Sequence, residues 1–258
     1  MKTVILVAAH KPYRMPEDPV YMPLHVGREG KAGFGYTGDD TGEHISGKNA
    51  NYCELTGLYW AWKNLECDVL GMAHYRRHFA KKRSCKPSWD NLISQAEIEA
   101  LLQNADAILP TPRNYMIETT YQQYAHAHHA QDLDKTRAIL AERWPQYLKK
   151  YDEVMARTWG HRFNMFIMKR ETADAYCEWL FSVLSELEKR LDISAYSAND
   201  ARVFGFVAER LIDVWLEHNG VRTCDAPVMF MERQNWLKKG GAFIWRKLRA
   251  GLPGKRRT

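Results

Sequence analysis

An abrupt change from apolar to polar residues marks positions 67–79 as a candidate site for chemistry. The run Val69-Leu70-Gly71-Met72-Ala73 is followed directly by His74-Tyr75-Arg76-Arg77-His78. A short apolar run with a sudden polar end predicts a buried strand of an α/β sheet, and ligands bind just outside the carboxyl ends of such strands. Paired guanidinium groups there suit a phosphate-bearing ligand, because each planar fork donates two parallel charged hydrogen bonds. The alternative is a solvated strand end with surface arginines.

The start of the chain has the same character. Residues Thr3 to Ala9 are β-branched and apolar, which predicts a buried parallel strand, and His10 and Lys11 follow at its carboxyl end. Such an end is a natural edge for a nucleotide pocket, although a plain polar loop would look the same.

A long loop separates these two strands. Residues Met15 to Gly47 are rich in Gly and Pro and contain the acidic pair Asp39-Asp40, which could bind a sugar hydroxyl or cap a turn. A helix is predicted from about Ala50 to Leu65. Lys48 and Asn49 lie at its amino end, where free N–H groups and the helix dipole favour an anion.

The remaining elements alternate between strands and helices, which predicts an α/β fold. Val20 to Val26 could form a short edge strand, because Pro23 excludes a central position. Further strands are predicted at 106–110, 163–168 and 228–231, and further helices at 121–144 (interrupted), 171–191 and 199–218.

Four residues in the middle of the chain resemble metal ligands at first sight: His126, His128, His129 and Asp132. Their spacing does not match that of a zinc site. Asp132-Leu133-Asp134 also matches a bare Asp-x-Asp pattern, but it stands at the start of a helix, where carboxylates are favoured without a metal. We therefore predict no metal site here.

The composition of the chain limits the classes of protein to which it can belong. The chain has 258 residues, 45% of them hydrophobic, so a full core can form. The five cysteines are scattered without metal-ligand or redox spacing, which favours reduced thiols in a cytoplasm. No stretch is long and apolar enough for a membrane span. The formal net charge of +6 suits an anionic partner, such as a nucleotide, a nucleic acid or a membrane surface.

The sequence changes character near its end, which predicts a main domain over 1–235 and a tail over 236–258. The tail interleaves Trp, Phe and Leu with Lys and Arg. This mixture suits the headgroup region of an anionic bilayer, and the alternative is a disordered tail or a helix packed on the body.

Four segments together resemble a known family: VAAHKPY, DDTGEHISGKNANYCELTGLYWAWKN, HYRRHF, and FNMFIMKRE followed by ARVFGFVAERLIDVWLE. They resemble a bacterial glycosyltransferase family first catalogued as a domain of unknown function and found in capsule, exopolysaccharide and O-antigen gene clusters. Its members are similar to the galactofuranosyltransferase module of a bifunctional O-antigen polymerase. The basic tail is not part of the resemblance.

The resemblance implies a GT-A-like nucleotide-diphospho-sugar transferase fold, with a mostly parallel central sheet flanked by helices. It implies transfer of galactofuranose or galactose from a UDP-sugar to a lipid-linked O-antigen or capsule glycan, with inversion. The cysteine usage and the tail predict a cytoplasmic location on the inner face of the membrane. Most GT-A enzymes hold a divalent ion with an Asp-x-Asp motif, but the corresponding strand here ends in His74-Tyr75-Arg76-Arg77. We therefore expect no cofactor, with fixed cations meeting the charge on the leaving diphosphate; Mn²⁺ or Mg²⁺ is the alternative.

Individual roles follow from the resemblance and from residue chemistry. The leaving diphosphate is assigned to Arg76 and Arg77, with Lys11 and Lys48 nearby. The donor sugar and uridine are assigned to His10, Asp39, Asp40, Asn49 and Glu54. Asn164 is expected on the acceptor side, and Arg202 completes the substrate-binding set. Glu209 could instead pair structurally with Arg202 or Arg210. The candidates for the catalytic base are Asp40, His74, Asp200 and Glu209, with Asp40 and His74 ranked first.

Two other classes of function are weighed against this one. A non-catalytic nucleotide-sugar or glycan-binding subunit would carry the same residues without turnover. A nucleic-acid binder is not expected, because the sequence has no RNP, KH or zinc signature and its basic residues gather in the tail.

Overall fold

A nine-stranded mixed sheet is the centre of the fold. The structure, a computed structural model, describes residues 1–232. The sheet order is β10 (Thr223–Ala226), β6 (Ala107–Pro110), β9 (Phe166–Lys169), β4 (Val69–His74), β1 (Thr3–Ala9), β2 (Tyr21–His25) and β3 (Thr37–Gly38). A hairpin strand, β5 (Arg77–Phe79), pairs with the end of β4 and with β11 (Val228–Phe230).

Most strands of the main sheet run in one direction. β1 pairs in parallel with both β2 and β4, and β10 pairs in parallel with β6. Only β9, inserted between β4 and β6, runs antiparallel within this path. The expected α/β fold with a mostly parallel central sheet flanked by helices is therefore confirmed.

Both faces of the sheet are buried. Leu6 of β1 belongs to a core shared with most of the helices, whereas its neighbours Ile5 and Val7 belong to a second core on the other face. This alternation follows from the two-residue period of a strand, and burial of both faces explains why β1 is almost continuously apolar.

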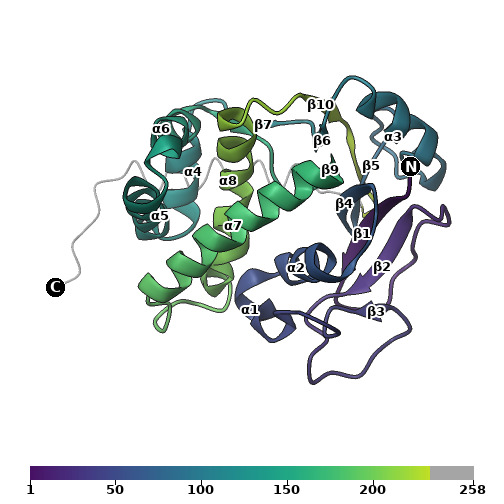
Figure 1. The fold of residues 1–258 in the computed structure, drawn as a ribbon, viewed down its shortest axis with the longest axis horizontal. Coiled ribbons are helices and arrows are strands. Elements are labelled where there is room, and N and C mark those ends of the chain that lie inside the picture. The colour runs from purple at the N-terminus through teal and green to yellow at the C-terminus, as the bar shows by residue number, and fades with distance from the viewer. Residues whose placement is uncertain (233–258) are drawn as a thin grey trace.

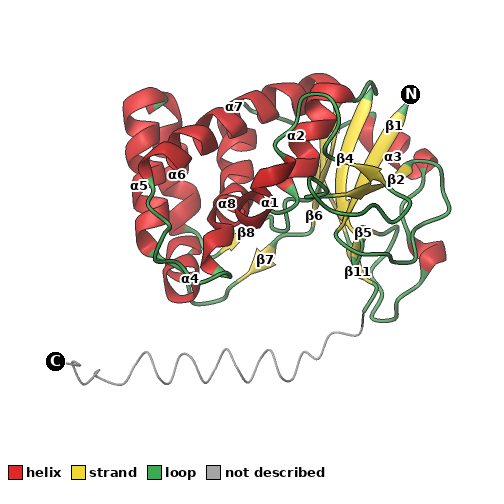
Figure 2. Cartoon of the chain, turned by 90° about the horizontal axis from the view of Figure 1, so that it is seen from below, coloured by secondary structure: helices red, strands yellow, loops and turns green. Residues whose placement is uncertain are grey.

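Eight α-helices cover the sheet and extend beyond it: α1 (Asn49–Tyr52), α2 (Leu55–Asn64), α3 (Gln95–Leu102), α4 (Thr120–Ala127), α5 (Ala130–Arg143), α6 (Leu148–Ala156), α7 (Arg170–Arg190) and α8 (Val203–His218) within residues 1–232. The long helices α7 and α8 lie between the sheet and a group formed by α4, α5 and α6 (Figures 1 and 2). A small two-stranded ribbon, β7 (Arg113–Asn114) with β8 (Trp159–Gly160), lies beside this group. Across residues 1–232, no helix has the length and apolar character needed to cross a membrane.

Two expectations about local structure were wrong. The helix predicted over 50–65 is broken at Cys53, whose φ of 55° lies in the left-handed region, so that α1 and α2 are separate. The strand predicted from Phe163 begins instead at Phe166, because Phe163 and Asn164 have φ values of 79° and 51° and form a turn before it. Both departures lie close to the candidate site described below.

Other expectations need only a boundary change or lie outside the described chain. β2 is not the outermost strand, since β3 pairs with its last two residues. Asp132 is buried, and both of its carboxylate oxygens accept hydrogen bonds from tyrosines, Tyr124 and Tyr196, rather than facing a metal. The predicted boundary at 235 and the predicted tail 236–258 lie outside the described residues.

Candidate functional site

The carboxyl ends of β1 and β4 meet at one edge of the sheet. The parallel register pairs Ala8 with His74, and the N–H of Tyr75 donates to the Ala8 carbonyl at 3.1 Å. The residues that follow each strand are therefore neighbours in space, although they are more than sixty positions apart. We call the cations Lys11, Arg76 and Arg77, together with the neighbouring imidazole of His10, the cationic rim.

Tyr75 is the side chain around which much of this rim is arranged. Its ring is buried, with 5% exposure, and the ring of His10 meets it edge-on with centroids 5.2 Å apart. The Lys11 ammonium lies 5.7 Å and the Arg76 guanidinium 4.8 Å from its centroid. Each such cation–π contact contributes about 0.5–1 kcal/mol at an exposed site. Sequence reasoning missed Tyr75, although its position between a histidine and two arginines was a usable signal.

Arg77 lies deeper than Arg76. It is partly buried, and its guanidinium carbon is 4.7 Å from the ring centroid of Phe163 and 5.9 Å from that of Phe230. Burial lowers the pKa of Arg77, and the charge of Glu209 opposes this effect most strongly. An arginine remains charged through such a shift, so Arg77 is a fixed cation held between two aromatic rings.

His10 differs from the other members of the rim. Burial lowers its pKa, and the charges of Arg76 and Lys11 lower it further. The imidazole is therefore neutral near pH 7, where it can act as a hydrogen-bonding group rather than as a cation.

A turn at Phe163 and Asn164, both of which have positive φ, lies against the rim, where the Phe163 ring contacts the Arg77 guanidinium. The Nε2 of His74 lies 2.6 Å from the Phe163 carbonyl oxygen, so this ring nitrogen must carry the proton and donate it. The Phe163 N–H donates to Glu209 Oε1 at 3.1 Å. The Asn164 amide donates to Glu54 Oε1 at 2.7 Å and to the Gly205 carbonyl at 3.0 Å. The turn thus joins the end of β4, the break between α1 and α2, and helix α8.

Arg202 approaches the same group from the start of α8. Its Nε lies 3.1 Å from the Cys53 sulfur, and its guanidinium lies 5.2 Å from the ring centroid of Phe206. Burial lowers the pKa of Arg202, but the hydrogen bond to Cys53 and the charges of nearby groups, among them Glu54, outweigh burial and raise it. The charges of both Glu54 and Glu209 raise the pKa of Arg202, so all three groups belong to one electrostatic cluster.

Of the predicted site residues, those brought together around the rim and the turn are His10, Lys11, Glu54, His74, Arg76, Arg77, Asn164, Arg202 and Glu209. Arg113, which sequence reasoning missed, also belongs to this group, because its guanidinium lies 5.8 Å from the Phe163 ring.

Asp39 has a different role from the one expected. It is fully buried, and its two oxygens accept hydrogen bonds from the N–H groups of Gly27 and Arg28 and from the hydroxyls of Ser46 and Thr56. Such a carboxylate has no lone pair to offer a sugar. Asp39 instead organises the loop between β2 and α1.

Three more residues that were predicted to contact the substrate instead interact with other side chains or backbone groups of the protein. Asn49 donates to the Cys53 carbonyl at 2.7 Å and packs against Gly27, where φ is 65° and an added Cβ would overlap the Asn49 side chain. The Lys48 ammonium pairs with Glu188 of α7 at 2.7 Å. Asp40 lies 3.4 Å from a guanidinium nitrogen of Arg28. The structure therefore supports a loop-stabilising role for Asn49 and ion pairs for Lys48 and Asp40.

The donor groups at this edge do not suit a divalent ion. Across residues 1–232, no group of three or more His, Cys, Asp or Glu side chains is placed to hold a metal. The side chains that follow β1 and β4 include Lys11, Arg76 and Arg77, whose positive charges repel a metal ion and attract an anion.

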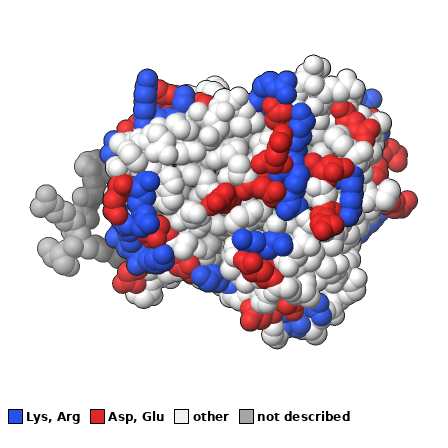
Figure 3. Space-filling view, viewed as in Figure 1, with Lys and Arg blue, Asp and Glu red and all other residues white. Residues whose placement is uncertain are grey.

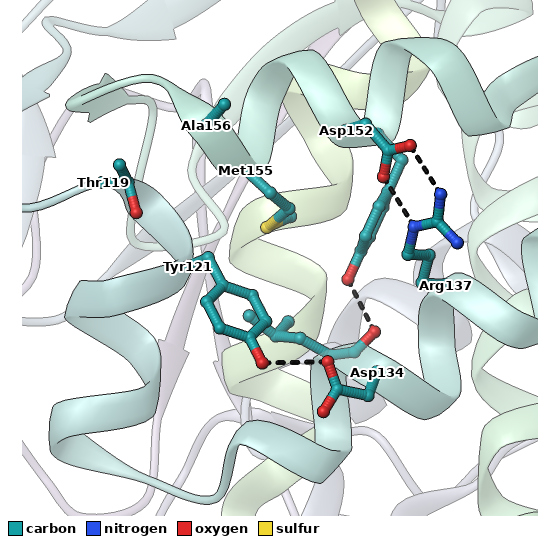
Figure 4. Close-up of a pocket in the computed structure, with 9 residues that line it drawn as sticks. Thr119, Tyr121, Asp134, Arg137, Asp152, Met155 and Ala156 are labelled. Carbon is teal, nitrogen blue, oxygen red and sulfur yellow. Dashed lines mark hydrogen bonds and ion pairs between the residues drawn. The ribbon is translucent and has the colours of Figure 1, made fainter.

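Two hollows in the described surface lie elsewhere. One, of about 230 Å³, lies among α4, α5 and α6, where Arg137 pairs with both oxygens of Asp152 and Tyr121 donates to Asp134 (Figure 4). The other, of about 440 Å³, is lined by residues such as Lys2 and Arg170 at the opposite edge of the sheet. Neither hollow contains a residue of the cationic rim. The polar side chains that line the first hollow are hydrogen-bonded to one another.

Comparisons with known proteins agree with the fold and with the resemblance noted in the sequence. The sequence model of a family described as "Domain of unknown function (DUF4422)" matches residues 4–220. The fold is also similar to a solved structure of the WbbM bifunctional glycosyltransferase, with a TM-score of 0.84 and 28% identity. That match covers 90% of this chain and 46% of the other, so this chain spans about half the length of that protein. No curated protein matches the sequence.

Proposed function

The chain belongs to the DUF4422 family of domains of unknown function, and from this premise we propose that it is a glycosyltransferase that uses a UDP-sugar donor. Its similarity to about half of a bifunctional glycosyltransferase supports the transferase class. Galactofuranose or galactose is the proposed sugar, and a lipid-linked O-antigen or capsule glycan is the proposed acceptor.

The observation that carries this proposal is the cationic rim at the joined ends of β1 and β4. Loss of a nucleoside diphosphate develops negative charge on the leaving phosphate, and preorganised positive groups stabilise that charge. Lys11 and Arg76, both set against the Tyr75 ring, and Arg77, set between two phenylalanines, are the proposed groups. These fixed cations would do the work that a divalent ion does in other enzymes of this fold.

The reaction is proposed to proceed with inversion. An acceptor hydroxyl attacks the anomeric carbon from the face opposite the diphosphate, while the bond from that carbon to the phosphate oxygen breaks. UDP departs with the bonding electron pair toward the rim, and a basic group removes the hydroxyl proton.

Transfer assays test the proposal. Purified protein would be incubated with UDP-galactofuranose or UDP-galactose and a lipid-linked or synthetic galactoside acceptor, with and without EDTA. We expect product in both conditions. Loss of product with EDTA and its return with Mn²⁺ would overturn the metal-free mechanism. UDP binding in calorimetry without product from either donor would favour the non-catalytic binding subunit instead.

A membrane partner is a separate part of the proposal and rests on sequence. Residues 236–258 combine aromatic side chains with Lys and Arg and contain no acidic residue. This composition supports peripheral attachment to the anionic cytoplasmic face of a membrane. Co-sedimentation of the full chain should be stronger with vesicles that contain phosphatidylglycerol than with phosphatidylcholine alone, and should weaken with salt. Equal binding to both would refute it.

A further inference from the structure

Backbone strain in the described chain is concentrated around one hydrogen-bonded pair, Glu54 and Asn164. Four non-glycine residues have positive φ, and three of them are Cys53, Phe163 and Asn164. Cys53 precedes Glu54, and Glu54 is hydrogen-bonded to Asn164 at 2.7 Å. A bulky side chain such as Phe163 at a φ of 79° is rare. Conformations of this kind persist only where the surrounding structure imposes them, and they cluster at active sites.

The orientation of the Asn164 side chain is determined by its partners. Its amide nitrogen faces two acceptors, Glu54 Oε1 and the Gly205 carbonyl oxygen, so the nitrogen and oxygen cannot be exchanged. The remaining carbonyl oxygen, Oδ1, is buried without a hydrogen-bond partner among the described residues, and the residue is only 5% exposed. Buried polar atoms are nearly always paired, so an unpaired one beside a group of ionised side chains points to a ligand hydroxyl.

The surroundings of Glu54 separate it from the other acidic candidates. Among the described residues, its carboxylate accepts one side-chain hydrogen bond, from Asn164. Glu209 accepts hydrogen bonds from Phe163 and Arg210. Asp40 is paired with Arg28. Glu54 is partly exposed and electrostatically close to Arg77 and Arg202, which places it beside the rim with an oxygen left for another donor.

We propose that Glu54 is the catalytic base and that Asn164 is a positioning residue that orients both the Glu54 carboxylate and the acceptor hydroxyl. This inference rests on the proposed function and deepens it. The acceptor O–H bond breaks and its proton passes to the Glu54 carboxylate, while the oxygen forms the new bond to the anomeric carbon. The bond between that carbon and the phosphate oxygen breaks, and UDP carries away the electron pair. His74 and Glu209, which were base candidates from sequence, instead hold the turn that carries Asn164.

The substitution Glu54→Gln tests the base directly. It keeps the shape of the side chain and the hydrogen bond from Asn164, but it removes the proton acceptor. We expect kcat to fall at least a hundredfold, as for a lost general base, with the Kd for UDP within about threefold of wild type. The control is Glu66→Gln, an exposed glutamate at the opposite edge of the sheet, which should leave kcat unchanged. Wild-type turnover in Glu54→Gln would overturn the inference.

The substitution Asn164→Asp gives an independent readout. Aspartate tolerates the positive φ at this position, so the turn is retained. It also places a second carboxylate beside Glu54, which disfavours the ionised base. We expect the acidic limb of the pH–kcat profile to move to higher pH, while Glu66→Gln leaves the profile in place. A purely structural role for Asn164 would lower activity equally at every pH and would overturn the inference.

Assays of the wild-type protein and of the two variants distinguish failure of the base assignment from failure of the proposed function. If wild-type protein transfers sugar but neither Glu54→Gln nor Asn164→Asp shows its expected effect, Glu54 is not the base and the transferase proposal stands. If wild-type protein transfers from neither donor, the proposed function falls and the inference falls with it.

Discussion

The guanidinium of Arg76 lies 3.2 Å from the carboxylate of Glu232, which is the last residue the structure describes. The N–H of Met231 also donates to the Arg76 carbonyl at 3.0 Å, and the preceding strand β11 pairs with β5. The chain therefore leaves the described fold at the cationic rim.

The charge of the molecule divides at the same point. Nine of the 37 Lys and Arg residues and none of the 31 Asp and Glu residues fall within 233–258, so residues 1–232 carry a formal charge of −3. Figure 3 shows acidic and basic side chains mixed over the face it presents, with wide uncharged areas between them. The positive rim is thus a local feature of a slightly acidic body.

The ion pair predicts that Glu232 competes with a bound phosphate for Arg76. The substitution Glu232→Gln should tighten UDP binding, because it removes the competing anion. Both side chains are more than a third exposed, so the gain should not exceed about 1 kcal/mol, or about fivefold in Kd. Isothermal calorimetry measures it. Weaker binding would mean that Glu232 does not compete with the ligand.

The rim predicts that its arginines act on turnover. Arg77→Ala and Arg76→Ala should each raise the barrier by about 2.7–4 kcal/mol if the group meets charge on the leaving phosphate, by analogy with lost oxyanion donors. Arg137→Ala, which removes a surface guanidinium paired with Asp152, is the matched control. Steady-state kinetics should show normal kcat only in the control. Normal turnover in either rim variant would remove that residue from the site.

The four hydrogen bonds to Asp39 predict an effect on stability. Asp39→Asn places an amide N–H₂ against donors and leaves some of the four without a partner. We expect the free energy of unfolding to fall by about 2–4 kcal/mol, since each unsatisfied buried group costs about 1–3 kcal/mol. Asp90→Asn, an exposed control, should be neutral in the same urea titrations. Unchanged stability in Asp39→Asn would return Asp39 to the list of substrate contacts.

A buried histidine predicts how stability depends on pH. Burial lowers the pKa of His161, but the hydrogen bonds and charges of Asp213 and Asp225 outweigh burial and raise it. The charged form therefore stabilises the folded state fully below the unfolded value of about 6.5, and this contribution is lost as the pH rises through the folded value.

His161→Gln removes that contribution. We expect wild type to exceed the variant by about 1–3 kcal/mol in free energy of unfolding at pH 5.5, and by less at pH 8.5. Urea titrations at the two values measure the difference. A gap that stays constant or grows at pH 8.5 would contradict the raised pKa.

Some of the candidate site follows from sequence alone. The ends of β1 and β4 were recognisable because an apolar run that stops abruptly indicates a buried strand. This pattern depends only on residues that are close together in the sequence. Parallel pairing then places the two ends together by a general rule of α/β sheets, so the residue pattern is enough to group His10, Lys11, Arg76 and Arg77. The absence of an acidic pair after β4 was visible in the same way.

The remaining features of the candidate site depend on the tertiary structure. Asp39 and Asn49 are residue types that often bind sugars. The loop folds so that their side chains form hydrogen bonds with nearby backbone groups instead. Glu54 and Asn164 are 110 positions apart, and their hydrogen bond depends on how α8 and the end of β4 hold the turn at Phe163. Local sequence sets burial periodicity and strand ends, whereas the partner of a polar side chain depends on long-range packing. The sequence therefore determined where cations gather, and the tertiary structure decided that the carboxylates of Glu54 and Glu209 lie beside them.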